Sequence, residues 1–102
     1  MARASRRIRI RRLRLSDYDG VIALLAVAKM NPHTRGRESP KAFARQLDAH
    51  PSTYLGAFDG DSLVGVVFGT HDSRKGWVNR LAVHPDHRRQ GIATRLAREC
   101  ER

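Results

Sequence analysis

The stretch from Trp77 to Cys100 reads WVNRLAVHPDHRRQGIATRLAREC and contains three successive patterns. WVNRLAV is largely apolar and is typical of a strand. HPDHRRQG combines a proline, two adjacent arginines and a glycine, which is typical of a tight loop. After Gly91 the apolar residues recur at helical spacing. The stretch therefore predicts a strand, a loop and an amphipathic helix in that order.

The beginning of such a helix is a candidate anion site. Its first N–H groups have no partner within the helix, and they lie at the positive end of the helix dipole. Gly91 allows a ligand to approach the backbone closely, Ala93 is small, and Arg88 and Arg89 add positive charge. A solvated turn before an ordinary amphipathic helix fits the same residues, because short glycine motifs often occur by chance.

The first half of the chain reads as a strand followed by two helices. Ile8 and Ile10 alternate with arginines, as do Leu13 and Leu15, and a β-bulge accounts for the shift of phase between the two pairs. A helix is predicted over roughly 17 to 29, with Ser16 as its N-cap.

The middle of the chain adds a second helix and a hairpin. The helix starts with Ser39 as N-cap and Pro40 in its first turn, and it ends before Pro51. TYLGAFD and SLVGVVFGTH flank Gly60 and Asp61 and so predict the hairpin. The expected order is β-α-α-β-β-β-α, an α/β (α+β) arrangement of a sheet flanked by helices.

Composition limits the classes of protein. The chain has 102 residues, 40% of them hydrophobic, and no apolar run approaches the length of a membrane span. Cys100 is the single cysteine, which excludes a disulfide or a CxxC metal pair within one chain and fits a reducing cytoplasm. His84 and His87 stand three apart without further clustered ligands, so no metal site is predicted.

The net charge of +10 would suit a nucleic-acid-binding protein. However, 17 of the 20 basic residues are arginines and seven of them lie within residues 3–14, where an edge strand with a solvated arginine face explains them. An Arg-rich presequence fits this segment less well than a strand. Aromatic residues are few, and Tyr54, Phe58 and Phe68 lie in strand patterns that suggest core, so no specific nucleic-acid partner is expected.

The chain resembles the GNAT superfamily of N-acetyltransferases. Arg88, Gly91 and Ala93 match the family's (Q/R)xxGx(G/A) signature, RLAVHPDHRRQGIATRL reads like its acetyl-CoA segment, and the order of elements is similar. The resemblance implies a GNAT-type mixed sheet and transfer of an acetyl group from acetyl-CoA to the amine of a small molecule or protein by direct attack. It implies that the following residues bind the cofactor, the first three along pantetheine and the others around the pyrophosphate: Leu81, Ala82, Val83, Arg88, Arg89, Gln90, Gly91, Ile92, Ala93 and Thr94.

The catalytic groups stay open at this stage. Transfer to an amine requires the neutral amine, so a base or a water relay has to remove a proton. Many relatives carry a glutamate on the strand equivalent to residues 77–83, but this strand has no carboxylate. Asn79 is a candidate for holding a water, or it is a buried amide bonded to a neighbouring loop. The loop from Asn31 to Ser39, with His33, Arg35 and Arg37, either lines an acceptor groove that favours an acidic acceptor or is simply solvated.

The chain stops at Arg102 inside a predicted helix, without a glycine, asparagine or proline to end it. We therefore expect residues 1–102 to be one GNAT domain that contains the N-terminal portion of the fold. We expect it to be cytoplasmic and not bound to a membrane, and a homodimer is one option for its oligomeric state. The alternatives are an incomplete or partner-completed coenzyme A-binding module without turnover, and a basic nucleic-acid-binding protein.

Overall fold

A computed structural model of the chain describes residues 8–32, 34–36, 38–71 and 76–101. The order of elements within these ranges is the predicted β-α-α-β-β-β-α. The elements are β1 (Ile8–Arg12), α1 (Tyr18–Val27), α2 (Pro40–Ala49), β2 (Tyr54–Asp59), β3 (Ser62–His71), β4 (Gly76–Val83) and α3 (Ile92–Glu101), with 3₁₀ turns over Leu15–Asp17 and Pro85–His87.

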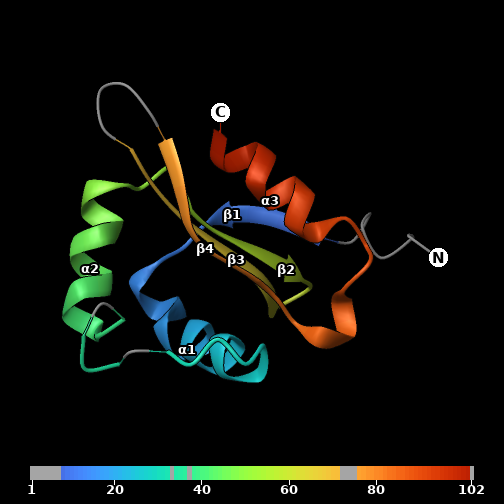
Figure 1. The fold of residues 1–102 in the computed structure, drawn as a ribbon, viewed down its shortest axis with the longest axis horizontal. Helices are drawn as coiled ribbons and strands as arrows, with labels where there is room; N and C mark the ends of the chain where they lie inside the picture. Colours follow the sequence, from blue (N-terminus) through green and yellow to red (C-terminus); the bar gives the residue numbers. More distant parts are fainter. Residues whose placement is uncertain (1–7, 33, 37, 72–75, 102) are drawn as a thin grey trace.

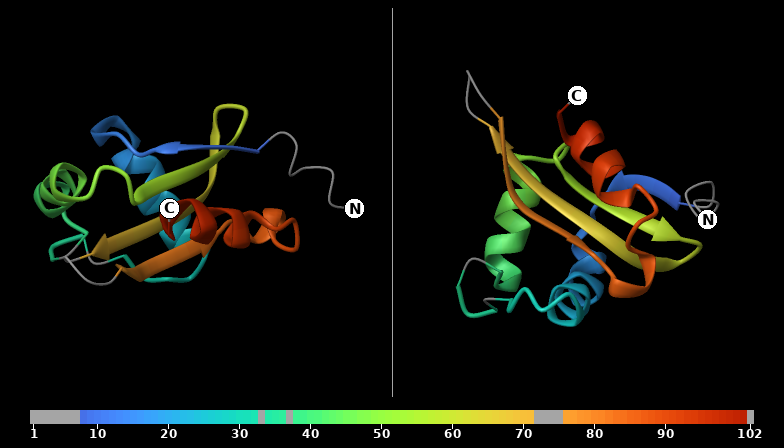
Figure 2. Two further views of the ribbon diagram at one scale, coloured as in Figure 1. Left: turned by 90° about the horizontal axis from the view of Figure 1, so that it is seen from above. Right: turned by 45° about the vertical axis from the view of Figure 1, so that its right-hand side comes forward.

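The four described strands form one sheet in the order β1-β2-β3-β4, and each neighbouring pair is antiparallel. Helix α3 covers one face of the sheet, whereas α1 and α2 lie on the other (Figure 1). The turned views in Figure 2 show the same three layers. The hairpin between β2 and β3 is confirmed, and its turn places Gly60 at φ +62°, a conformation that suits glycine.

Two apolar clusters fill the space between the layers. The cluster under α1 and α2 includes Leu25, Phe43 and Phe68, and the cluster under α3 includes Ile92 and Leu96. Leu25 and Leu96 have no exposed surface. The predicted core aromatics Tyr54, Phe58 and Phe68 are buried. Both clusters include residues from the same sheet. The end of β4 and the start of α3 therefore lie against well-packed apolar side chains.

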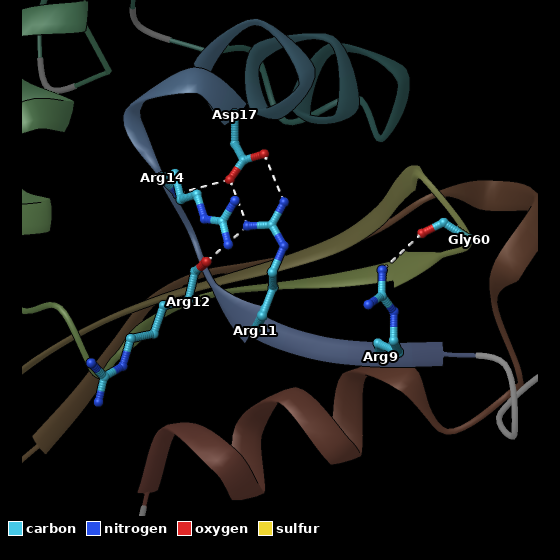
Figure 3. Close-up of polar contacts among 6 residues, drawn as sticks. All are labelled: Arg9, Arg11, Arg12, Arg14, Asp17 and Gly60. Carbon is cyan, nitrogen blue, oxygen red and sulfur yellow. Dashed lines mark hydrogen bonds and ion pairs between the residues drawn. The ribbon is translucent and has the colours of Figure 1, made fainter.

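The arginines of β1 lie on a strand, as predicted, although residues 1–7 fall outside the described ranges. Arg11 stacks over the Phe58 ring at 4.0 Å from its centroid, and its Nη1 and Nη2 donate to the two carboxylate oxygens of Asp17 at 2.9 and 3.1 Å. Figure 3 shows this pair beside Arg9, whose Nη2 donates to the Gly60 carbonyl. Part of the basic charge of this segment is therefore paired within the fold.

Two local expectations for this segment are wrong. The β1–β2 register runs without a shift from Ile8 to Arg12, so no bulge separates the two apolar pairs. Leu13 is buried and its N–H still bonds to Tyr54, whereas the chain then turns and leaves Leu15 57% exposed. The residue that precedes α1 is Asp17, not Ser16, and its carboxylate accepts from the Arg14 N–H at 2.7 Å.

The Asp17 contacts predict a pH-dependent contribution to stability. Burial alone raises the pKa of Asp17, but the hydrogen bonds from Arg11 and from the Arg14 N–H, with the charges of both arginines, lower the pKa below its ordinary value. A lowered folded-state pKa stabilises the protein above the unfolded pKa, and this stability disappears as the pH falls through the folded pKa.

Asp17→Asn is therefore expected to lower the free energy of unfolding by about 1–2 kcal/mol near neutral pH. The difference from the parent protein should shrink as the pH falls below about 4 and through the lowered folded-state pKa, because protonation then makes the Asp17 side chain neutral, as in the variant. Urea unfolding at pH 7 and pH 3 measures this difference. Asp61→Asn, in the exposed turn between β2 and β3, serves as the control. A pH-independent loss in the Asp17 variant would contradict the electrostatic explanation.

Strand β4 contains an irregularity that matters for the site. Arg80 pairs with Phe68, but the next partner of β3, Gly69, pairs with Val78, so Asn79 is an extra residue in β4. A bulge at this point breaks the alternation of faces. Asn79 consequently does not share the orientation of Leu81 that strict strand parity predicts.

Candidate functional site

The loop between β4 and α3 is tied to the sheet at several points. The His84 N–H bonds to the Val64 carbonyl at 2.8 Å, and His84 Nδ1 accepts from the Asp86 N–H at 3.1 Å. His87 Nε2 lies 3.4 Å from Asp59 Oδ2 at the end of β2. These contacts explain the two histidines as loop supports. No cluster of three or more potential metal ligands occurs in the described ranges.

The loop ends in two residues with left-handed backbone conformations directly before α3. Arg89 has φ +65° and Gly91 has φ +77°, and the Gly91 carbonyl accepts from the Arg95 N–H at 3.0 Å. Gly91 therefore occupies the N-cap position but has no side chain to cap the first turn. An ideal Cβ on Gly91 would meet no other described atom within 4 Å. The first-turn N–H groups thus have open space beside the N-cap in which an anion fits.

A groove of about 460 Å³ runs from this helix start along β4, and we call it the loop groove. Nine of the ten predicted cofactor residues line it, and Gln90 is the exception. The Gln90 Oε1 atom is buried and has no hydrogen-bond partner among the described residues. The sequence analysis missed three further lining residues: Ala28, Met30 and His87. Ala28 and Met30 lie directly after the end of α1, and the sequence offered no signal that this part of the chain reaches the groove.

The edge of β4 offers backbone hydrogen-bonding groups to the loop groove. The His84 N–H bonds to the Val64 carbonyl, and residues of an antiparallel pair alternate between bonded and non-bonded positions. By this alternation, Ala82 exchanges bonds with β3, whereas the N–H and C=O groups of Leu81 and Val83 point away from β3. No described strand lies beyond β4.

A second groove of about 460 Å³ lies on the face of the sheet that carries α1 and α2, and we call it the Glu38 groove. Aromatic side chains form much of its lining, and Tyr54 and Phe68 stack with centroids 4.7 Å apart. Its charged lining residues among those described are Glu38 and Arg80. The remaining lining residues are Tyr18, Val21, Ile22, Phe43, Gln46, Thr70, Val78 and Asn79.

Glu38 is a buried carboxylate that the sequence analysis did not single out. Only 6% of its side chain is exposed, and its two oxygens accept from Arg80 Nη2 at 2.9 Å and Nε at 3.0 Å. Burial and the charges of Asp19 and Glu38 raise the pKa of Tyr18, so its hydroxyl stays protonated near neutral pH. That hydroxyl donates to the Glu38 carbonyl at 2.5 Å.

The other sequence candidates have different outcomes. Asn79 is exposed, lines the Glu38 groove, and donates from Nδ2 to Thr70 Oγ1 at 3.0 Å, so the interpretation as a buried amide is wrong. The bulge in β4 explains its position. Arg35 is exposed and does not line this groove, and His33 and Arg37 lie outside the described residues. Cys100 packs against the cluster under α3, as expected for a structural thiol.

Comparisons with known proteins converge on one group. Residues 11–102 match the model of the "Acetyltransferase (GNAT) family". The chain is 33% identical over 94 residues to an acetyltransferase of Pectobacterium atrosepticum and 32% identical to one of Sodalis glossinidius, in each case covering 91% of this chain and 64% of the relative. The chain thus spans somewhat less than two thirds of the length of these curated relatives.

A solved structure has a similar fold. The PaiA N-acetyltransferase of Thermoplasma acidophilum, in complex with coenzyme A, superimposes with a TM-score of 0.80 at 21% identity. The match covers 92% of this chain and 69% of that protein. Within the part of the chain that the structure describes, no helix has both the length and the apolar character needed to cross a membrane.

Proposed function

The chain belongs to the acetyltransferase (GNAT) family, and from this premise we propose that it binds acetyl-CoA in the loop groove and transfers the acetyl group to a primary amine in the Glu38 groove. One observation carries the proposal. The residues that match the family's signature, Arg88, Gly91 and Ala93, line one groove with the edge of β4.

The residues present fit the cofactor. The open space at the Cβ position of Gly91 and the uncapped first turn of α3 suit a pyrophosphate group, with Arg88 and Arg89 as exposed positive charges beside it. The outward N–H and C=O groups of Leu81 and Val83 suit the amide groups of the pantetheine arm, which add hydrogen bonds to a strand edge.

Acetyl-CoA supplies an acetyl group on a thioester, and the protein's task is to position it and to stabilise the charge that develops on its carbonyl oxygen. A backbone N–H of β4, at Leu81 or Val83, is a rigid donor for that oxygen. Transfer forms a carbon–nitrogen bond to the acceptor and breaks the carbon–sulfur bond, so that coenzyme A leaves as a thiolate. The amine loses one proton and the thiolate takes up one, which balances the reaction.

The acceptor amine has to be neutral when it attacks. Strand β4 carries no carboxylate, so we propose a water held by the Asn79 amide or by backbone carbonyls as the first proton acceptor. The exposed amide of Asn79 lies in the lining of the Glu38 groove. The acceptor itself is a small-molecule or protein amine.

If the loop groove binds coenzyme A, the affinity should depend strongly on the phosphate groups of the cofactor. Coenzyme A should bind at least about tenfold more tightly than pantetheine, which lacks the phosphates, because charge-assisted hydrogen bonds at the start of α3 contribute to binding coenzyme A alone. Isothermal titration calorimetry measures both affinities, and acetyl transfer to amines measures the activity. Equal affinity for the two compounds would refute the assignment of the pyrophosphate to Gly91.

A further inference from the structure

Among the described residues, the Arg80 side chain of β4 bonds to both ends of the segment that joins α1 to α2. Arg80 Nη1 donates to the Met30 carbonyl at 3.0 Å, at the beginning of this segment. The Nε and Nη2 atoms of Arg80 bond to both carboxylate oxygens of Glu38, at its end. Arg80 therefore holds two points that are eight positions apart in the sequence.

This attachment is largely buried. The exposed fractions of the Arg80 and Glu38 side chains are 12% and 6%. A two-point contact between a guanidinium and a carboxylate fixes both direction and distance. The Tyr18 hydroxyl fixes Glu38 a second time, because it donates to the Glu38 carbonyl. The position of Glu38 is thus determined by contacts from β4 and from α1.

The attachment joins residues that line different grooves. Arg80 and Glu38 line the Glu38 groove, whereas Met30 and Leu81, the neighbour of Arg80 on β4, line the loop groove. Neighbouring residues of a strand point to opposite faces, so positions 80 and 81 face different grooves across one strand. A displacement of Arg80 would change the position of the Glu38 groove lining relative to the loop groove.

We propose that Arg80 and Glu38 are positioning residues that hold the α1–α2 connection against β4 and so set the geometry of the acceptor site relative to the bound cofactor. This role rests on the proposed function and concerns the acceptor side of it. It assigns no proton transfer to Glu38, whose carboxylate oxygens are both bonded to Arg80. Affinity for coenzyme A depends mainly on the start of α3 and the edge of β4, so it should change much less than affinity for the amine when the pair is removed.

The test compares Arg80→Met with the double variant Arg80→Met/Glu38→Gln. Removal of Arg80 alone leaves Glu38 as a buried, unpaired charge, and this variant can fail to fold for that reason alone. The double variant removes both charges and keeps the volume of the side chains nearly constant. Arg45→Met, at an exposed position on α2, is the control for the loss of a surface arginine.

Hydrogen exchange, the KM for the amine and the Kd of coenzyme A are measured on each folded variant. In the double variant, hydrogen exchange at residues 29–32 and 38–39 should rise by about tenfold or more, while exchange in the middle of α3 stays as in the parent protein. With spermidine, a lysine-containing peptide and an alanine-terminated peptide as probe acceptors, the KM for the best amine should rise about tenfold, and the Kd of coenzyme A should change less than about threefold.

The outcomes distinguish the positioning role of Arg80 and Glu38 from the proposed acetyl transfer. Unchanged exchange at residues 29–32 and 38–39, or equal losses of amine and coenzyme A affinity, would overturn the positioning role. If the parent protein acetylates none of the three probes, the proposed amine transfer is not supported for these acceptors, and the exchange pattern still decides whether Arg80 holds the connection.

Discussion

Gly91→Asp is expected to weaken binding of coenzyme A by about 100-fold or more, because the new carboxylate would occupy the space proposed for the pyrophosphate. An ideal Cβ at this position meets no described atom within 4 Å, so the side chain would extend into the open groove instead of clashing with the protein. Repulsion between like charges a few ångströms apart at a partly solvated site costs about 1–4 kcal/mol.

The control for this variant is Gly91→Asn. Gly91 has φ +77°, and any L side chain there adds strain, but asparagine tolerates this region better than most residues and has nearly the shape of aspartate. The asparagine variant should therefore share the steric part of the effect and lack the charge. Calorimetry with coenzyme A measures both. Equal affinities of the two variants would place the phosphates elsewhere.

Leu96→Ala is expected to lower the free energy of unfolding by about 3 kcal/mol, within the range typical of fully buried leucines. Leu96 has no exposed surface and packs against the sheet so closely that an ideal Cβ on Gly65 would lie 3.1 Å from its Cδ1. Truncation leaves a cavity between α3 and β3, which the sheet cannot fill without moving the helix.

Urea unfolding measures this loss, and Arg98→Ala at an exposed position on the same helix is the control. The control should change the free energy of unfolding by about 0.5 kcal/mol or less. Because α3 begins at the loop groove, the Leu96 variant should also bind coenzyme A more weakly than the control. A loss of stability below about 1 kcal/mol would show that α3 contributes little to the fold.

The order of elements was predictable because its signals are local. The hairpin around Gly60, the Ser39–Pro40 start of α2 and the apolar spacing of α3 each depend on neighbouring residues. The candidate loop was predictable for the same reason, since a strand, a glycine and a helix start follow each other directly. Nine of the ten residues expected at the cofactor line one groove.

The local errors had a different origin. Ser16 is a suitable N-cap residue, but it lies inside the 3₁₀ turn Leu15–Asp17, and α1 begins after Asp17. The bulge expected in the first strand is absent, and a bulge that was not expected occurs in β4 at Asn79. The register of a strand depends on how it pairs with its neighbour in the sheet, which local sequence signals do not fix.

The sequence by itself determined the helix start at Gly91, since a strand-to-helix loop with these residues requires no knowledge of distant partners. Only the tertiary structure decided the acceptor side. Glu38 and Arg80 are 42 positions apart, and neither periodicity nor composition indicates that they meet. Periodicity determines which face of an element is buried, whereas the partner of a buried charge depends on how the elements pack. For this reason the Glu38 groove became visible only when α1, α2 and β4 were seen together.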